Sequence, residues 1–280
     1  MADAIPIRRP AFSLAGPGAT SGRPPRHWHA AGPFASHFFD ALSSTFPFGE
    51  AFFVRSVLAQ RDRITDPELL ARIRGFAGQE GQHSRLHDEH VDLLLADGDR
   101  LITVRNRFID RILRFQNRRW PMLSLALTAA LEHLTAILAR ALLADGARRT
   151  HAMHPAMAPL WRWHAFEEAE HKAVAFDVLL RVAPGRSRRI VAMGIASFFL
   201  AFETTLRTAY LLGKDGLLFD RATWSAGLRF LFGAEGLLRD TGPAYRAWYA
   251  RDFHPDGTDD SALLAASWPV IDRELAGPAA

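Results

Sequence analysis

Two segments of the chain place a glutamate three residues before a histidine, a spacing that can hold a metal ion. The pairs are Glu80 with His83 and Glu168 with His171. Because an α-helix turns by about 100° per residue, side chains three positions apart lie on one face. Carboxylate oxygens and imidazole nitrogens are common ligands of iron, manganese and zinc. A single Glu-x-x-His also occurs on solvated helix faces as an ordinary side-chain contact, so the rest of the sequence must decide between the two interpretations.

Two further glutamates stand alone in apolar surroundings. Glu50 lies in a segment with four phenylalanines, Phe46-Pro-Phe-Gly-Glu-Ala-Phe-Phe53, and Glu132 is the only acid between Leu123 and Leu138. Burying an unpaired carboxylate costs several kcal/mol, and a bound cation would offset that cost. For Glu50 the alternative is a residue in the first turn of a helix, where the helix dipole favours an acid.

These acids follow a repeated order along the chain: a segment with one glutamate, a segment with Glu-x-x-His, a connection, and the same two segments again. The order matches the ligand set of four-helix di-iron carboxylate proteins, in which two helices each give one Glu and the other two each give Glu-x-x-His. We therefore expect a site for two metal ions whose ligands are Glu50, Glu80, His83, Glu132, Glu168 and His171.

His164 is a candidate seventh ligand. It lies four residues before Glu168 and seven before His171, so all three side chains fall on one helix face. Glu167 lies near the same face, and the alternative is that His164 supports the ligands without binding metal. Three other histidines are expected to lie around or outside the site: His87, His90 and His133.

The hydrophobic periodicity predicts an all-α protein built on a ferritin-like four-helix bundle. Helices are expected at 36–63, 66–98, 121–146 and 155–182, with Pro47 either kinking the first of them or starting a new one. The arginine-rich segment 101–119 would be the long crossover between helices two and three. The predicted divisions are a disordered arm (1–26), the bundle (27–185), additional apolar helices packed on it (186–253) and a loosely ordered tail (254–280).

The composition excludes several kinds of site. There is no cysteine, so disulfides, zinc–thiolate sites, iron–sulfur clusters and a cysteine nucleophile are absent. The sequence pI is about 10.1, but the net charge is only +4. The basic residues are arginines scattered among acids, apart from Lys172 and Lys214. A chain without a basic run is not expected to bind nucleic acid.

The segment 190–212 is the most apolar part of the C-terminal third. Its uncharged part, residues 190–202, is shorter than the ~20 residues that span a bilayer, and Glu203 can pair with Arg207. We expect a core or interfacial helix, with peripheral membrane contact and a lipid-like substrate as the alternative. Arg8-Arg9 is reminiscent of a twin-arginine signal, but Pro10 interrupts the apolar stretch that should follow, which favours the cytoplasm.

The same stretches resemble the ferritin-like di-iron carboxylate superfamily, and more closely a bacterial family labelled predicted metal-dependent hydrolase. The likeness covers most of residues 5–265 and is carried by Ile7-Arg8-Arg9, the segment 39–53, Phe76-Ala-Gly-Gln-Glu-Gly-Gln-His83, Thr128-Ala-Ala-Leu-Glu-His-Leu-Thr-Ala136, Trp163-His-Ala-Phe-Glu-Glu-Ala-Glu-His-Lys172 and Asp252-Phe-His-Pro255. His164 is similar to the additional histidine of the p-aminobenzoate N-oxygenase group.

Together these features predict an oxidoreductase that activates O2 at two iron ions and oxidises a small, apolar organic substrate. A Mn/Fe or other divalent pair is an alternative to two irons. Electrons would come from an external donor such as a ferredoxin or a reductase, since no flavin or nicotinamide fingerprint is present. The rival functions are a two-metal hydrolase that uses a metal-activated water and an iron-binding or storage bundle. A monomer and a homodimer are both compatible with the sequence.

Overall fold

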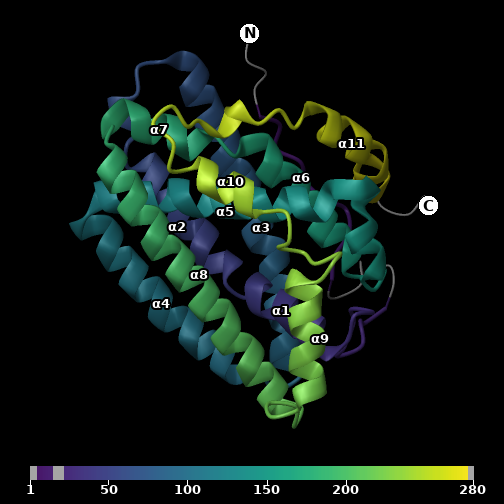
Figure 1. Ribbon diagram of the computed structural model, residues 1–280. Helices are drawn as coiled ribbons and strands as arrows, with labels where there is room; N and C mark the ends of the chain where they lie inside the picture. The colour runs from purple at the N-terminus through teal and green to yellow at the C-terminus, as the bar shows by residue number, and fades with distance from the viewer. Residues whose placement is uncertain (1–4, 15–21, 277–280) are drawn as a thin grey trace.

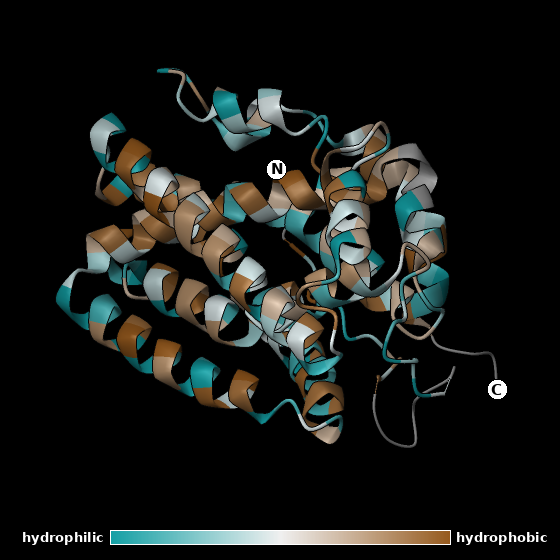
Figure 2. Cartoon of the chain, turned by 60° about the horizontal axis from the view of Figure 1, so that its bottom comes forward, coloured by the Kyte–Doolittle hydropathy of each residue, from teal (hydrophilic) through white to brown (hydrophobic). Residues whose placement is uncertain are grey.

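The computed structural model describes residues 5–14 and 22–276, and the regular secondary structure of these residues is helical (Figure 1). Outside the helices, His29 and Met153 form an isolated antiparallel bridge. Brown and teal residues alternate along several helices in Figure 2, as expected of amphipathic helices that bury one face. The predicted all-α class is therefore confirmed. The ferritin-like arrangement of the helices stays a resemblance.

The first predicted helix is two helices, α1 (Pro33–Ser43) and α2 (Phe46–Leu58). They meet at Ser44 and Thr45, whose hydroxyls donate to the carbonyls of Ala41 and Leu42. Pro47 lies in the first turn of α2, where a missing backbone N–H costs nothing. Of the two expected roles for Pro47, starting a new helix is the correct one.

The next helix, α3 (Pro67–Ala96), has the predicted ends. The Asp66 carboxylate accepts hydrogen bonds from the backbone N–H groups of Glu68 and Leu69, which have no partner within the helix. Gly98 follows the helix with a φ of 89°, a conformation that glycine adopts without strain. The second predicted helix is confirmed.

The expected crossover is itself a helix, α4 (Arg100–Arg119). Leu101, Val104, Phe108, Ile112 and Phe115 recur at a spacing of three or four along it, and all five are exposed. The helix that follows, α5 (Pro121–Ala147), is the buried core helix that was expected.

The fourth predicted helix is interrupted directly after a candidate ligand. The chain forms a 3₁₀ turn (Arg148–Ala152), then α6 (Ala158–His171) and α7 (Val174–Val182). Between α6 and α7, the ammonium of Lys172 donates to the carbonyl of Thr258 and to the carboxylate of Asp260. The expectation of one continuous helix over 155–182 is wrong, since residues 172 and 173 leave the helical path.

The C-terminal third forms α8 (Arg186–Lys214), α9 (Arg221–Phe232), the short α10 (Gly242–Ala247), a 3₁₀ turn (Pro255–Gly257) and α11 (Ser261–Leu275). In Figure 1, α8 runs beside α4 and crosses α1 and α5. The Arg105 guanidinium of α4 binds both carboxylate oxygens of Glu203 on α8, at 2.7 and 2.6 Å.

Both ends of the described chain pack more tightly than expected. Ile5, Phe12 and Leu14 are buried in the core, so the expectation of a disordered arm is wrong for residues 5–14. Trp268 of α11 packs on Phe166 of α6, and the expectation of a loosely ordered tail is wrong for residues 261–275. Apolar side chains that pack into the core account for both corrections. Residues 1–4, 15–21 and 277–280 lie outside the described residues.

Two helices of the described residues are long and apolar enough to cross a membrane by length and composition. Within α5 the apolar window is 72% buried by the rest of the protein, which identifies it as a core helix. Only 28% of the corresponding window of α8 is buried. Both helices are long and apolar, but the rest of the protein covers most of the apolar window of α5, whereas it leaves most of the apolar window of α8 uncovered.

Candidate metal centre

Four helices bring the six predicted ligands together in the interior. Glu50 comes from α2, Glu80 and His83 from α3, Glu132 from α5, and Glu168 and His171 from α6. Each of the six side chains is at most 2% exposed. The two Glu-x-x-His pairs and the two lone acids, which are far apart in sequence, thus form one cluster.

Among the described residues, the cluster contains four overlapping groups of possible ligand atoms, two of which share Glu80. The other two contain His164, once with His83 and Glu168 and once with Glu50 and His87. Oxygen and nitrogen atoms of Glu50, Glu80 and His83 lie within 4.8 Å of one another, and so do those of Glu80, Glu132 and His171. His171 Nε2 is 3.2 Å from Glu80 Oε1 and 3.4 Å from Glu132 Oε2. Glu80 is the residue that these two groups share.

Many polar atoms of the cluster have no hydrogen-bond partner among the described residues. They are Oε1 of Glu50, both carboxylate oxygens of Glu80 and of Glu132, Nδ1 of His83 and Nε2 of His171. Leaving a buried polar atom unpaired costs on the order of 1–3 kcal/mol, and a native interior avoids such atoms. Hard oxygen donors and imidazole nitrogens that converge in this way fit two divalent transition-metal ions.

The four carboxyl groups differ in their affinity for protons. Burial, together with the negative charge of nearby glutamates, raises the pKa of Glu50 and of Glu132 well above the usual range. Burial also acts to raise the pKa of Glu80, but His171 and His83 outweigh burial and lower this pKa. For Glu168, His164 and His171 outweigh burial and lower the pKa well below its usual value. Without bound ions, Glu50 and Glu132 therefore hold a proton more tightly than Glu80 and Glu168 do.

Two imidazoles balance the ionised carboxylates. Burial opposes their charging, but the Glu167 carboxylate, which accepts a hydrogen bond from His83, and the nearby Glu80 carboxylate raise the pKa of His83 to about 10. Burial opposes the charging of His171 as well, and the charge of Glu132 raises its pKa well above the usual value. Ligand groups must lose their protons to bind a metal ion, so metal binding here would release protons.

Each ligand histidine is oriented by a partner on its other ring nitrogen. His83 Nε2 is 3.0 Å from an oxygen of Glu167, and His171 Nδ1 is 2.9 Å from the side-chain oxygen of Gln79. Such partners fix which nitrogen faces a metal. Arg8 donates to Glu167 at 3.0 Å and so joins the N-terminal segment to the centre. Sequence reasoning noted Glu167 only as a neighbour and missed the roles of Gln79 and Arg8.

His164 lies beside the six residues. Its Nε2 is 3.2 Å from Glu168 Oε1, and its Nδ1 is 2.7 Å from His87 Nε2. The ring stacks on His83 with 4.2 Å between centroids and on Phe46 with 4.7 Å. The proximity to Glu168 leaves both expected roles open, and ligation by His164 stays a prediction.

The remaining histidines lie near or outside the centre, as expected. His87 is buried and also 2.7 Å from the hydroxyl of Ser43. His90 pairs with Asp40. His133 faces the carbonyl oxygen of Ala244 at 3.1 Å and stacks on Trp248, away from the cluster.

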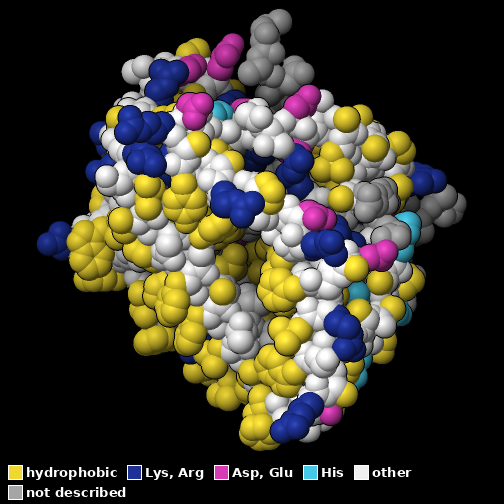
Figure 3. Space-filling view, in the orientation of Figure 1, with side chains coloured by type: hydrophobic (Ala, Val, Ile, Leu, Met, Phe, Trp, Pro, Cys, Tyr) yellow, Lys and Arg dark blue, Asp and Glu magenta, His cyan; other side chains and the backbone are white. Residues whose placement is uncertain are grey.

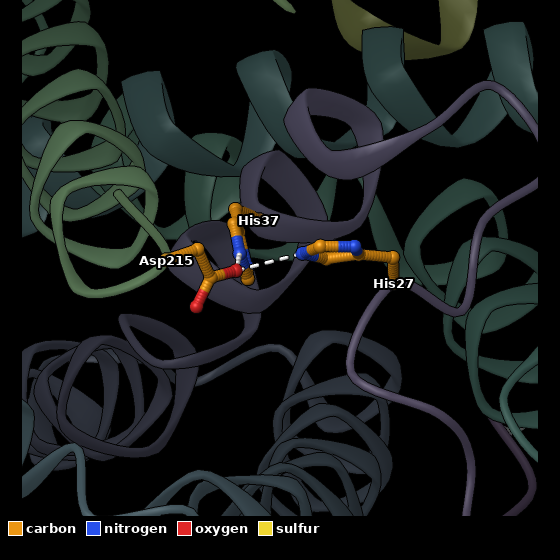
Figure 4. A group of neighbouring side chains, drawn as sticks. All are labelled: His27, His37 and Asp215. Atoms are coloured by element: carbon orange, nitrogen blue, oxygen red, sulfur yellow. Dashed lines mark hydrogen bonds and ion pairs between the residues drawn. The ribbon is translucent and has the colours of Figure 1, made fainter. Parts of the chain in front are cut away.

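A second group of potential ligands lies at the end of α8 and was missed by the sequence analysis. In Figure 4, His27 and His37 point toward Asp215. Each Nε2 is 2.7 Å from Asp215 Oδ2, and the Arg26 Nε donates to Asp215 Oδ1 at 2.7 Å. These ligand atoms already have partners, unlike those of the main cluster. We interpret the group as an ion-pair network that ties residues 26 and 27 to α1 and α8.

Asp40 continues this network into the core. Its carboxylate faces the indole N–H of Trp28 and ring nitrogens of His37 and His90 at 2.8–3.0 Å. Burial alone would raise the pKa of Asp40, but the hydrogen bonds from His37 and His90 outweigh it and lower the pKa to about 2. Because the folded pKa lies below the usual 3.8, Asp40 stabilises the fold above pH 4, and this contribution is lost as the pH falls toward 2.

We predict that Asp40→Asn lowers the free energy of unfolding at pH 7 by about 2–3 kcal/mol, the equivalent of this pKa shift. The difference from the native chain should shrink below pH 4, where the carboxylate of the native protein takes up a proton. Urea unfolding at several pH values measures it. The exposed Asp92 is the control, since Asp92→Asn should change little at any pH. A loss that does not vary with pH would show that the charge of Asp40 is not responsible.

Comparison with known proteins gives one match. A family model described as "Predicted metal-dependent hydrolase" matches residues 8–259. No curated protein matches the chain, and no solved structure does. The matched range contains all six clustered ligands, His164 and Arg8.

Proposed function

The chain belongs to the family of predicted metal-dependent hydrolases, and we propose that it is an enzyme that hydrolyses a bond of a small, apolar substrate with two bound metal ions. The ions would be held by Glu50, Glu80, His83, Glu132, Glu168 and His171. The observation that carries the proposal is the convergence of buried, unpartnered carboxylate oxygens and imidazole nitrogens from four helices. When bound, such ions supply Lewis-acid polarisation and lower the pKa of a coordinated water.

The protein's own contribution is to hold and orient these groups. Glu167 and Gln79 present the correct nitrogen of His83 and His171 to the centre. The Ser84 hydroxyl donates to Glu50 at 2.9 Å, and the Thr135 hydroxyl donates to Glu168, so two carboxylates are fixed before any ion binds. Pre-oriented ligands reduce the reorganisation that the reaction would otherwise require.

Aromatic side chains exclude water from the cluster. Phe76 contacts the His171 ring with 5.0 Å between centroids, and Trp163 contacts His83 at 4.7 Å. Phe76 and Trp163 are completely buried. Electrostatic interactions are stronger in such a dry site than in water, and a reactive group within it is protected from side reactions.

A second candidate is oxidation of the substrate with O2 at two iron ions, with electrons from an external donor. The observation that favours it is the lining of the cavity next to the centre, whose only charged side chains, among the described residues, are Arg105 and Glu203. An apolar chain in that cavity would present C–H bonds, while a carboxylate-rich ligand set suits iron in its higher oxidation states. Iron storage is less favoured, because storage needs no cavity for an organic molecule.

Parallel activity assays distinguish these functions. Protein loaded with Zn(II), Mn(II) or Fe(II) is given acyl esters of p-nitrophenol, and the Fe(II) protein is separately given O2 and a chemical reductant. Metal-dependent ester hydrolysis that disappears in Glu80→Ala supports the hydrolase. Reductant-dependent O2 consumption without hydrolysis, lost in the same variant, supports the oxidase. A protein that binds no metal contradicts both.

A further inference from the structure

A cavity of about 330 Å³ lies between α2, α4, α5 and α8. This volume is at the lower end of the roughly 300–1,000 Å³ of small-molecule pockets. Its walls are mainly aliphatic and aromatic, and include Phe52, Phe53, Leu127, Leu131, Ile195 and Phe199. The lining therefore suits a slender apolar group.

The inner end of this cavity reaches the metal centre. Thr135 and Phe46 line both the cavity and a narrow space of about 20 Å³ that is also lined by His164 and Glu168. The Thr135 hydroxyl donates to Glu168, and Phe46 stacks on His164. A molecule that fills the cavity would thus end one residue away from the cluster.

Gly49 keeps the middle of the cavity open. It lies within α2, directly before Glu50, and lines the cavity. A Cβ atom added at Gly49 would meet no atom within 4 Å, so no close packing requires a glycine here. Glycine inside a helix costs roughly 1 kcal/mol relative to alanine. The missing side chain has no structural benefit in the described protein, and its effect is to leave space for a ligand.

The side of the cavity formed by α4 and α8 carries a net positive charge. The Arg105–Glu203 pair lines this side, and Arg207 Nε donates to Glu203 at 3.3 Å. Arg207 Nη2 is buried and has no hydrogen-bond partner among the described residues. A surface groove that shares Arg105 and Phe108 with the cavity is lined by Arg207 as well. Two guanidinium groups beside one carboxylate leave one positive charge, which suits an anionic headgroup.

The entrance lies in an apolar surface. Phe108 of α4 and Phe199 and Phe202 of α8, which line the cavity, are 59%, 55% and 45% exposed. Figure 3 shows hydrophobic side chains gathered over α4, α8 and α9, with a hollow between α8 and α9. That hollow is a second cavity of about 570 Å³, lined by α1, α5, α8, α9 and α10. It also adjoins the narrow space beside His164 and Glu168, with which it shares Leu42 and Leu138, but among the described residues its lining has no charged side chain, so it offers no headgroup site.

We propose that the cavity between α2, α4, α5 and α8 binds a single-chain amphiphile. The anionic head lies at Arg105 and Arg207, and the apolar chain runs past Gly49 to Thr135. This names the substrate class of the metal centre. The claim that the amphiphile is the substrate rests on the proposed function. The claim that the cavity binds an amphiphile does not.

The test uses dodecanoate, below its micelle concentration, and isothermal titration calorimetry. The native protein should bind one molecule per chain. Gly49→Leu, whose side chain occupies the cavity, should weaken binding at least tenfold. Gly194→Leu is the matched control, because Gly194 is an exposed glycine within α8 whose Cβ would also meet no atom within 4 Å. It should bind as the native protein does. Equal affinity of native protein and Gly49→Leu, or no binding at all, overturns the proposal.

A second comparison tests the orientation of the ligand. Arg105→Gln should weaken dodecanoate several-fold and leave the binding of dodecan-1-ol unchanged, because only the carboxylate uses the guanidinium. If Arg105→Gln weakens the binding of neither compound, the head does not lie at Arg105 and the proposed orientation is wrong.

Metal analysis of Gly49→Leu should give the native metal content. If the native protein contains metal but does not bind dodecanoate, the amphiphile site is wrong and the proposed function is unaffected. If it binds dodecanoate but contains no metal, the proposed function is wrong and the amphiphile site is unaffected.

Discussion

Glu80→Ala is expected to reduce the metal content from about two ions per chain to less than one, because Glu80 belongs to two of the groups of ligand atoms. The metal-free fold should persist. Without ions, the variant gives up the contact between Glu80 Oε1 and His171 Nε2 at 3.2 Å, but the other helix contacts around the cluster remain. The loss of metal should abolish any metal-dependent activity.

Elemental analysis of protein expressed with ample iron measures the content, and circular dichroism checks the helices. The control is Glu68→Ala on the same helix, since Glu68 is exposed and should leave the metal content unchanged. A chelator should lower the melting temperature of the native protein and of Glu68→Ala, but change that of Glu80→Ala little, because ligands stabilise only the state that binds them. Native metal content in Glu80→Ala would show that Glu80 does not lie between two ions.

The sequence was sufficient to find the cluster because its ligands obey local rules. Glu80 with His83 and Glu168 with His171 share a face by the helical period alone. Glu50 and Glu132 were recognisable because each was a single acid among apolar residues. Four helices that each bury a carboxylate bring them together, since a shared cation relieves the cost for all of them.

The partners of the ligands could not be predicted in the same way. Arg8 reaches Glu167 across 159 residues, and no periodicity links positions so far apart. Residues 5–14 were assigned to an arm because Pro and Arg dominate the N-terminal composition, yet Phe12 and Leu14 are core residues. At the break after His171, Lys172 binds Asp260, which belongs to a segment that was expected to be loose. Tertiary contacts decide each of these features.

The amphipathic character of α4 was also missed, and it bears on function. The arginines of 101–119 drew attention to charge, whereas the apolar residues between them line the proposed amphiphile site together with α8. Exposed apolar surface of this kind is typical of ligand-binding grooves and interaction sites. If the protein receives its substrate from water, we expect it to be soluble without detergent. This expectation is independent of whether the cavity binds an apolar chain.

His164 and His171 share one face of α6, but their replacement is expected to have different effects. His171 Nε2 has no hydrogen-bond partner and faces Glu80 and Glu132, so His171→Ala should lose most of the bound metal. His164 Nδ1 is already engaged with His87, and its Nε2 is 3.2 Å from Glu168 Oε1. His164→Ala should therefore keep about two ions, the number expected of this ligand set, while changing the coordination of one of them.

Cobalt makes this difference visible, because the ligand-field absorption of Co(II) responds to a lost nitrogen ligand. We expect His164→Ala loaded with Co(II) to keep its metal and show an altered visible spectrum, and His171→Ala to show little absorption. His133→Ala is the control, since His133 faces the carbonyl oxygen of Ala244 away from the cluster and should leave the spectrum unchanged. If His164 only packs against His83 and Phe46, its loss would cost on the order of 1–3 kcal/mol of stability with an unaltered spectrum. That result would remove His164 from the ligand set, and the six clustered residues would then be the complete donor set for both ions.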